Sequence, residues 1–587
     1  MIQFQLMKCR NITTQIAYQI QIWQFQKILF IQKEKNQRLI NQFICNKIML
    51  SKIQQMAFSS LRKLPKNQNQ AQLLGEYAID FLKNGNPSQK VLERVKLFHT
   101  DSVFTGISAL ALKTNAPSIL KAEALENASG LGNKPKKGVS RCFGSDQNVP
   151  VEKAVCANSS AVREWDSNGT VFGYNETQPT NRAGEFGHND FYPAVLAAAH
   201  QNAAINGKTV LKAMVLQDEI RGRLCEAFSL KSYKIDHVVH GAIATICTYG
   251  ALMGATPLQM EHAIGMFCAH YIPFRAIRAG KQLSDSKGAS AAISTEAALM
   301  CIKRAINGFI GPKDIFRNPE AIFRLNEPTN GDSPFDIFVS EGGDDFAVMG
   351  MHFKLGLYEH QSAGALEGLQ KLIYENKFLK HNEFDSISKI KIIAYEPAFG
   401  IIGDPAKRKC QTRQSADHSM VYIVSTMLRK AIQDKTFVDS LSSYKSLDDV
   451  WKKLILLPDD YSQKAIFDPV TKKLMDLMEF EHGGKEYDSK YPEGIPTTIQ
   501  ITLKDGRTFD SKLVMFPSGH AKNTACDLRG ILENKFKLLG KLALAENEIQ
   551  PMIERLMNLD NLSNNDLQLL YNCNIRYSQK SVDDPDY

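Results

Sequence analysis

The sequence predicts a mainly α-helical protein with an α/β insertion, in which a discontinuous all-helical domain is joined by a smaller α+β domain. Three observations support this fold class. Amphipathic, Ala-rich runs fill residues 71–345, β-branched strand candidates lie within residues 346–517, and helical runs return in residues 518–560. Two all-α segments that flank an α/β insertion are expected to share one core. The rest is a leader, residues 1–70, and a polar tail, residues 561–587, which we expect to be loose.

The first helical segment contains a series of apolar runs with helical periodicity. Thr256–Pro257 and Ser284–Asp285–Ser286 are typical helix starts. The predicted helices are Gln70–Asn84, Val91–Lys113, Pro150–Asn158, Pro193–Asn206, Thr209–Leu230, His240–Met253, Pro257–His270 and Ser286–Phe309.

The insertion holds the strand signals. Residues 389–395 read KIKIIAY, a β-branched strand candidate. In residues 497–510 apolar and polar side chains alternate around Asp505–Gly506, which predicts a β-hairpin. Helical runs lie at 363–374 and 419–430 inside the insertion, and at 535–544 and 548–556 after it.

The formal net charge of +9 belongs to the leader. Residues 1–75 hold eleven Lys or Arg and one acidic residue, so the rest of the chain is nearly neutral and gives no argument for a nucleic-acid partner. From Met49 onward the sequence contains Ser, Lys and Arg, its apolar residues have helical spacing, and no acidic residue occurs before Glu76. These features are typical of mitochondrial transit peptides. We therefore predict import into the mitochondrial matrix. Either all of 1–70 is presequence or translation starts at Met49; a basic disordered tail is the alternative.

Metal and membrane signals are weak. The eleven cysteines form no Cys-x-x-Cys pair, which argues against zinc ribbons and the usual iron–sulfur motifs. His237 and His240 share a helical face, but no third ligand accompanies them. The longest stretch without charged residues, His237–Met260, contains Gly and Pro and predicts a buried helix. We predict no metal, no cofactor and no membrane span.

Two polar segments are candidates for a site. Asp166–Thr170 is rich in turn-forming residues, and His188 precedes the helix predicted from Pro193. Loops that lead into a helix N-terminus can present N–H groups to an anion. The alternative is an Asx-rich connecting loop in which His188 caps the helix.

Cations gather in two places. Arg275, Arg278, Lys281 and Lys287 surround a predicted helix start, where a cation opposes the helix dipole. A bound carboxylate or phosphate would offset that cost; the alternative is a solvated basic loop. Lys354 lies among apolar and aromatic residues, and is either an anion ligand or a snorkelling surface residue.

In order along the chain, these segments resemble the MmgE/PrpD family over roughly residues 75–540. The resemblance rests on DSNGT at 166–170, EFGH at 185–188, DHVV at 236–239, SDSKGASAA at 284–292, HFKLGLYEHQSAGAL at 352–366, ADHSMVYIVSTML at 416–428, and ITLKDGRTF with FPSGHA at 501–521.

The resemblance implies a set of site residues. Asp166, His188, His237 and Tyr422 are expected to be catalytic. Thr170, Lys287 and Lys354 are expected to bind substrate, and Arg278 is added as a further nearby cation. The residues after Asp166 and after His188 depart from the family pattern beside the expected pocket, so these departures bear on substrate identity rather than on fold. From its position alone, Tyr422 would be a core residue of a helix.

The resemblance further implies a cofactor-independent lyase acting on a citrate-like tricarboxylate. We expect dehydration of 2-methylcitrate to 2-methyl-cis-aconitate, a step of propionate breakdown. The alternatives are a cis-aconitate decarboxylase that produces itaconate, and a non-catalytic mitochondrial structural or assembly protein. The family also implies a homodimer, with the α+β domain acting as a lid over the helical domain and the pocket between them.

Overall fold

A computed structural model of the chain describes residues 61–176, 185–278 and 282–587. Most of the predicted leader, and Lys281, lie outside the described residues. Residues Lys63–Tyr587 form one compact unit. Leu64 is buried in this unit, and the Gln70 side chain donates hydrogen bonds to the carbonyls of Leu64 and Phe335. Residues 64 and 70 therefore both belong to the packed unit, and the leader boundary at residue 70 stays a prediction.

The described chain is mostly helical with small sheets, which confirms the predicted fold class. In the first helical segment, α11 packs against α6, α9 and α10, and α8 packs against α9. Thr256 closes a capping box at the start of α10, as the sequence predicts. The helices are α3 (Gln70–Asn84), α4 (Gln89–Ala111), α5 (Asn115–Glu126), α6 (Val151–Arg163), α7 (Tyr192–Ala199), α8 (Gly207–Ala227), α9 (Val238–Leu252), α10 (Pro257–His270), α11 (Asp285–Ile306) and α12 (Ile322–Asn326).

Short strands accompany these helices. The pair that bears on the site is β5 (Thr170–Val171) with β6 (Gly187–His188), which are antiparallel. The others are β1 (Leu61–Leu64), β2 (Asn86–Pro87), β3 (Val139–Ser140), β4 (Val149–Pro150), β7 (Ile337–Ser340) and β8 (Gly342–Gly343).

The predicted strands lie in a four-stranded sheet with the order β10-β9-β11-β12. The KIKIIAY run lies in β9 (Ile387–Ala394), and the predicted hairpin joins β11 (Thr497–Leu503) to β12 (Thr508–Asp510), with Gly506 at a φ of +90° in the turn. The parallel edge strand β10 (Met478–His482) was not predicted. The helices of this part are α13 (Ala363–Asn376), α14 (Arg413–Ala416), α15 (Met420–Gln433), α16 (Lys435–Ser440), α17 (Leu447–Leu454), α18 (Gln463–Ile466), α19 (Pro469–Asp476) and α20 (Gly484–Asp488).

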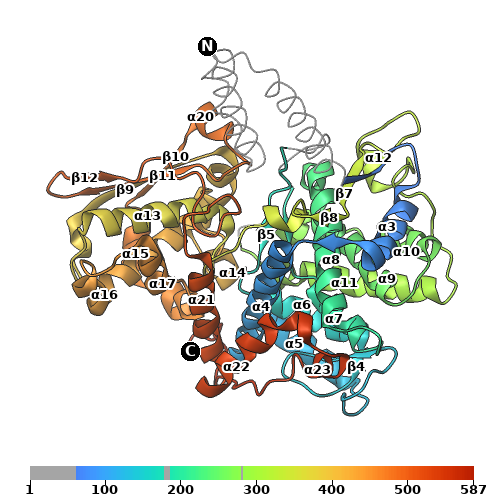
Figure 1. Ribbon diagram of the computed structural model, residues 1–587. Helices are drawn as coiled ribbons and strands as arrows, with labels where there is room; N and C mark the ends of the chain where they lie inside the picture. Colours follow the sequence, from blue (N-terminus) through green and yellow to red (C-terminus); the bar gives the residue numbers. More distant parts are fainter. Residues whose placement is uncertain (1–60, 177–184, 279–281) are drawn as a thin grey trace, which may run out of the picture. The chain divides into compact units, whose positions relative to one another are not determined.

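The chain then returns to the first helical segment. Helices α21 (Leu528–Ala543) and α22 (Glu546–Met557) both pack against α4, and Figure 1 shows them beside it. Phe536 of α21 stacks on Phe104 of α4, with ring centroids 5.8 Å apart. The helical domain is therefore discontinuous, as the sequence predicts.

The tail is not loose, contrary to the prediction. After α23 (Asn564–Gln568), Tyr571 and Val582 are buried against the helical core. The backbone N–H of Val582 donates to the Leu112 carbonyl, and Asp583 forms an ion pair with Arg413. Polar composition misled the prediction, because the apolar residues that the tail does contain, among them Leu567, Leu570 and Ile575, are buried in the core.

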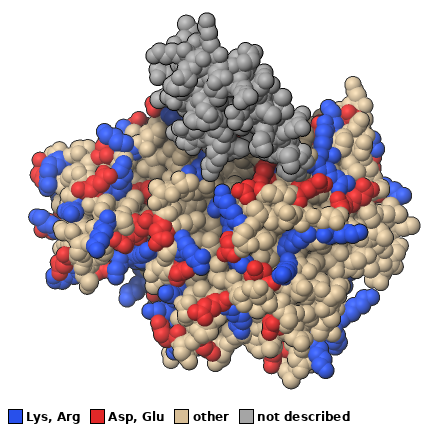
Figure 2. Space-filling view, in the orientation of Figure 1, with Lys and Arg blue, Asp and Glu red and all other residues tan. Residues whose placement is uncertain are grey.

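The charge-free stretch forms the buried helix α9, as expected. Among the helices of the described residues, none combines the length and apolar character that a membrane crossing requires. On the face drawn in Figure 2, Lys and Arg side chains are interspersed with Asp and Glu.

Candidate active site

Asp166 is the centre of a buried charge cluster. It follows α6 in a loop and adopts a φ of +50°. Its Oδ1 contacts the guanidinium of Arg163 and lies 2.8 Å from Lys354 Nζ. Its Oδ2 lies 3.8 Å from Lys287 Nζ and 3.3 Å from His418 Nε2. The structure thus brings together Asp166, Lys287 and Lys354, which the sequence predicts as site residues.

Lys287 lies in the first turn of α11, where its charge opposes the helix dipole. The carboxylates of Asp166 and Asp417 offset this cost, the latter at 3.4 Å from Nζ. Burial nevertheless lowers the pKa of Lys287 to about 7, against the opposing effect of Asp417. Burial also lowers the pKa of Lys354 well below its usual value, and Arg163 adds to that shift. Both amines can therefore change protonation when an anion arrives.

Two neighbouring residues were missed by the sequence reasoning. Asp417 and His418 precede α15, whose first turn is capped by Ser419. His418 Nδ1 lies 2.5 Å from Asp417 Oδ1 and Nε2 lies 3.3 Å from Asp166 Oδ2, so the ring lies between two carboxylates, while burial lowers the pKa of the imidazole well below its usual value. Both residues belong to the ADHS sequence at 416–419, which is part of the family resemblance, but only Tyr422 of that segment was predicted as a site residue.

Arg163 was also missed. It ends α6, is almost fully buried, and stands three residues before Asp166. Its guanidinium contacts Asp166 and lies 3.3 Å from His188 Nε2. The sequence did contain an indication of this role, because a basic residue three positions before a candidate acid can pair with it on a helix.

Tyr422 lies on α15 with its hydroxyl donating to the Asp460 carbonyl at 2.7 Å. Its ring packs near Tyr461, and burial raises the pKa of its phenol. In the described part of the chain, its hydroxyl is not among the groups that contact Asp166. The structure therefore places Tyr422 in the environment of a core tyrosine, and a catalytic role for it stays a prediction.

Thr170, His188 and His237 come together on the other side of Arg163. Thr170 and His188 are directly paired across β5 and β6, and the rings of His188 and His237 have centroids 5.1 Å apart. Burial lowers the pKa of both imidazoles well below the usual value, with Arg163 adding to the shift for His188. Both rings are therefore neutral at pH 7 and able to accept a proton.

Arg278 holds the segment that carries His237. Its guanidinium binds the Asp236 carboxylate through Nε and through Nη2, the latter at 3.0 Å from Oδ1. Burial opposes ionisation of Asp236, but the Arg278 guanidinium holds the pKa of that carboxyl well below its usual range. Asp236 Oδ1 lies 3.6 Å from His237 Nδ1. Arg278, predicted to bind substrate, is paired with Asp236 in this structure.

Asp166, Asp417 and His418 could by geometry hold a metal ion, because one ligand atom from each lies within 4.8 Å of the others. The same two carboxylates already contact Arg163, Lys287 and Lys354. A divalent cation would be placed against these positive groups, so the donor set fits poorly. The expectation of no metal stays a prediction.

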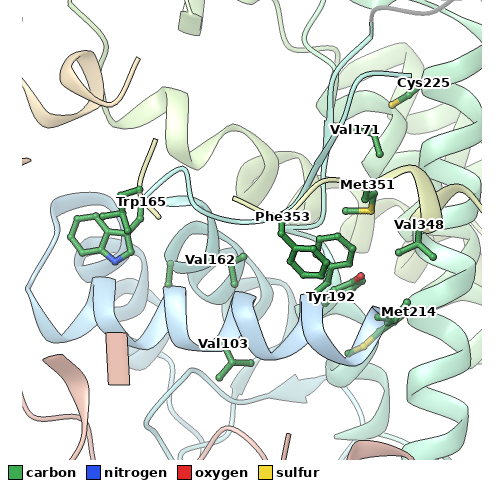
Figure 3. Packing of buried hydrophobic residues seen from close by; sticks show 14 of the residues in the cluster. Val103, Val162, Trp165, Val171, Tyr192, Met214, Cys225, Val348, Met351 and Phe353 are labelled. Carbon is green, nitrogen blue, oxygen red and sulfur yellow. The ribbon is translucent and has the colours of Figure 1, made fainter. Parts of the chain in front are cut away.

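The site rests on a packed apolar layer. Phe353, next to Lys354, stacks on Phe98 of α4 with ring centroids 3.8 Å apart. Figure 3 shows Phe353 among the buried residues of this layer, together with Val171, which follows Thr170. Groups fixed on such a core can hold a precise geometry.

The fold and the site define a class of protein: a discontinuous helical domain with an α+β insertion, whose buried cluster combines carboxylates, amines and neutral imidazoles. Residues 73–330 match the MmgE/PrpD N-terminal domain, and residues 450–559 match the MmgE/PrpD C-terminal domain, together more than half of the chain. The chain belongs to the MmgE/PrpD family.

Individual relatives are distant. An alkylcitrate dehydratase from a fungal species is 24% identical over 357 residues, which is 60% of this chain and 64% of that protein. The mitochondrial 2-methylcitrate dehydratase of Yarrowia lipolytica is 24% identical over 373 residues, or 60% and 65%. The 2-methylcitrate dehydratase of Escherichia coli K12 is 22% identical over 373 residues, or 61% and 70%. The matches to the first two thus span slightly less than two thirds of each relative.

Proposed function

We propose that the protein is a hydro-lyase that dehydrates a citrate-like tricarboxylate, 2-methylcitrate in the first place. The observation that carries the proposal is the grouping of Arg163, Lys287 and Lys354 around Asp166, with His188 and His237 beside it. Three cations in one buried site suit a ligand with three carboxylates. The names of the relatives, all dehydratases of citrate derivatives, agree with this chemistry.

The arrangement provides for both proton transfers of a dehydration. A neutral imidazole, His188 or His237, takes the proton next to a substrate carboxylate. The paired cations stabilise the negative charge that develops on that carboxylate. The departing hydroxide needs a proton; in this proposal Tyr422 supplies it, or the other imidazole after the bound carboxylates have raised its pKa and protonated it. Thr170 and Asp166 orient the substrate hydroxyl.

The proposal is tested by incubating the purified full chain separately with 2-methylcitrate, citrate and cis-aconitate. Ultraviolet absorbance should grow with 2-methylcitrate, because dehydration places a carbon–carbon double bond beside a carboxylate. CO2 release from cis-aconitate without that growth would replace the proposal by a decarboxylase. Inactivity of a well-folded protein on all three would favour a structural or assembly role.

Two further properties are part of this proposal. We place the protein in the mitochondrial matrix, in keeping with the basic leader and with the mitochondrial relative of Yarrowia lipolytica. We also propose a homodimer, which light scattering of the purified chain would test by giving twice the 65.7 kDa chain mass.

A further inference from the structure

A second buried ion pair lies behind the Asp166 cluster. Lys535 of α21 and Asp101 of α4 are both fully buried, and Lys535 Nζ lies 2.7 Å from Asp101 Oδ1. Burial lowers the pKa of Lys535, and the Asp101 carboxylate opposes that shift. Burying two charges costs several kcal/mol per ion, and their attraction only partly offsets this cost. The pair therefore calls for an explanation beyond stability.

The other donors of Lys535 go to the main chain of the site. Nζ donates to the Ser167 carbonyl at 3.0 Å and to the Lys354 carbonyl at 2.7 Å. Nζ therefore donates two hydrogen bonds to main-chain carbonyls, and its third close contact is the ion pair with Asp101. Ser167 follows Asp166 directly in the chain, and Lys354 is the residue whose side chain pairs with Asp166. Lys535 thus holds the backbone on both sides of that contact.

We propose that Lys535 is a positioning residue for the candidate active site. Through the carbonyls of Ser167 and Lys354 it fixes the Asp166 carboxylate relative to the Lys354 ammonium, and Asp101 neutralises its charge. Asp166 has a positive φ, a conformation that non-glycine residues keep only when their surroundings impose it. Lys535 supplies such a restraint from a helix distant in sequence. The inference rests on the proposed function for the chemistry of the site, but not for its geometry.

The test removes both charges together, because Lys535→Met alone would leave Asp101 buried and unpaired. In Lys535→Met/Asp101→Leu, kcat for 2-methylcitrate should fall about 10²-fold, since misplacement by ~1 Å has effects of that size. The matched control is Lys96→Met on the same helix α4, where Lys96 pairs with Glu93 and Asp560. It should lower the melting temperature and leave kcat within about twofold.

A folded double variant whose kcat stays within about twofold of wild type would overturn the proposal. If this variant does not fold, Lys535→Leu/Asp101→Asn, which removes the Lys535 donors to both carbonyls, receives the same measurements. A crystal structure of the folded variant gives a second readout: the distance from Lys354 Nζ to Asp166 Oδ1 should lengthen from 2.8 Å. An unchanged distance would also overturn the proposal. This readout needs no substrate, so it separates a failure of positioning from a failure of the proposed lyase activity.

Discussion

Lys354 Nζ lies 2.8 Å from Asp166 Oδ1, and each side chain is only about 1% exposed. A buried ion pair of this kind is weak evidence for stability. Arg163 and Lys287 also contact this carboxylate, while Asp190 lies 3.6 Å from Arg163 and Asp417 lies 3.4 Å from Lys287, so several basic groups share several acids here. A substrate carboxylate that enters the site can therefore pair with one of these basic groups while Asp166 keeps the others.

Replacing Lys354 should weaken the binding of tricarboxylates. For Lys354→Met we expect the dissociation constant of tricarballylate, an unreactive tricarboxylate, to rise about 10- to 100-fold, the effect of losing one charged hydrogen bond. Asp166 keeps Arg163 and Lys287, so the variant should fold. Calorimetric titration measures the change, and Lys435→Met on the exposed face of α16 is the control that should bind like wild type. Unchanged affinity in Lys354→Met would remove it from the site.

Ligand binding should take up protons near neutral pH. Because the pKa of Lys287 is lowered to about 7, this amine is largely neutral at pH 8 in the free protein. An anion next to it favours the ammonium and raises that pKa, so a proton enters with the ligand. The binding enthalpy of tricarballylate at pH 8 should therefore differ between Tris and HEPES, and the difference should shrink in Lys287→Met. Equal enthalpies in the two buffers for wild type would contradict this.

His418 and Tyr422 should respond differently to conservative substitution. His418→Gln removes the imidazole nitrogen that lies 3.3 Å from Asp166 Oδ2, so we expect kcat to fall by ~10²-fold. Tyr422→Phe removes a hydroxyl bonded to the Asp460 carbonyl, so we expect about 1 kcal/mol lower unfolding free energy and little change in kcat. Steady-state kinetics and urea unfolding separate the two effects. A large loss of kcat at unchanged stability in Tyr422→Phe would restore it as the proton donor.

A buried histidine outside the site should set part of the acid sensitivity. Burial lowers the pKa of His99 to about 3, and His99 Nε2 lies 3.0 Å from the Tyr571 hydroxyl of the tail. The folded pKa is below the unfolded value of about 6.5, so the stability that neutral His99 contributes is complete above pH 6.5 and is lost as pH falls toward 3. Between pH 7 and 5, wild type should lose about 2 kcal/mol more unfolding free energy than His99→Gln. Equal losses would show that His99 is protonated in the folded state.

Local signals predicted much of the fold. Helix α10 has the predicted bounds. Thr256 caps its N-terminus, and Pro257 at the first helical position ends any helix that precedes it. The hairpin of β11 and β12 follows from Asp505–Gly506. Strand β10 was missed because its text, MEFEH, carries charged residues and few β-branched ones.

The site depended on the family resemblance, because its contacts are non-local. Nothing near Lys354 in the sequence indicates Asp166, and the pairing of Thr170 with His188 depends on the course of the loop between them. Arg163 lies beyond Asn158, where the sequence predicted the end of this helix, and its burial arises only from tertiary packing. The support from Lys535 is likewise invisible in a sequence without the fold.

The most direct test of the central claim is the ultraviolet-followed turnover of 2-methylcitrate by the full chain and by Lys287→Met, each with EDTA present. We predict that wild type turns over at the same rate with and without EDTA, and that Lys287→Met is slower by at least ~10²-fold. No turnover by the folded wild type, or a variant as fast as wild type, would contradict the assignment of the Asp166 cluster as a tricarboxylate dehydratase site.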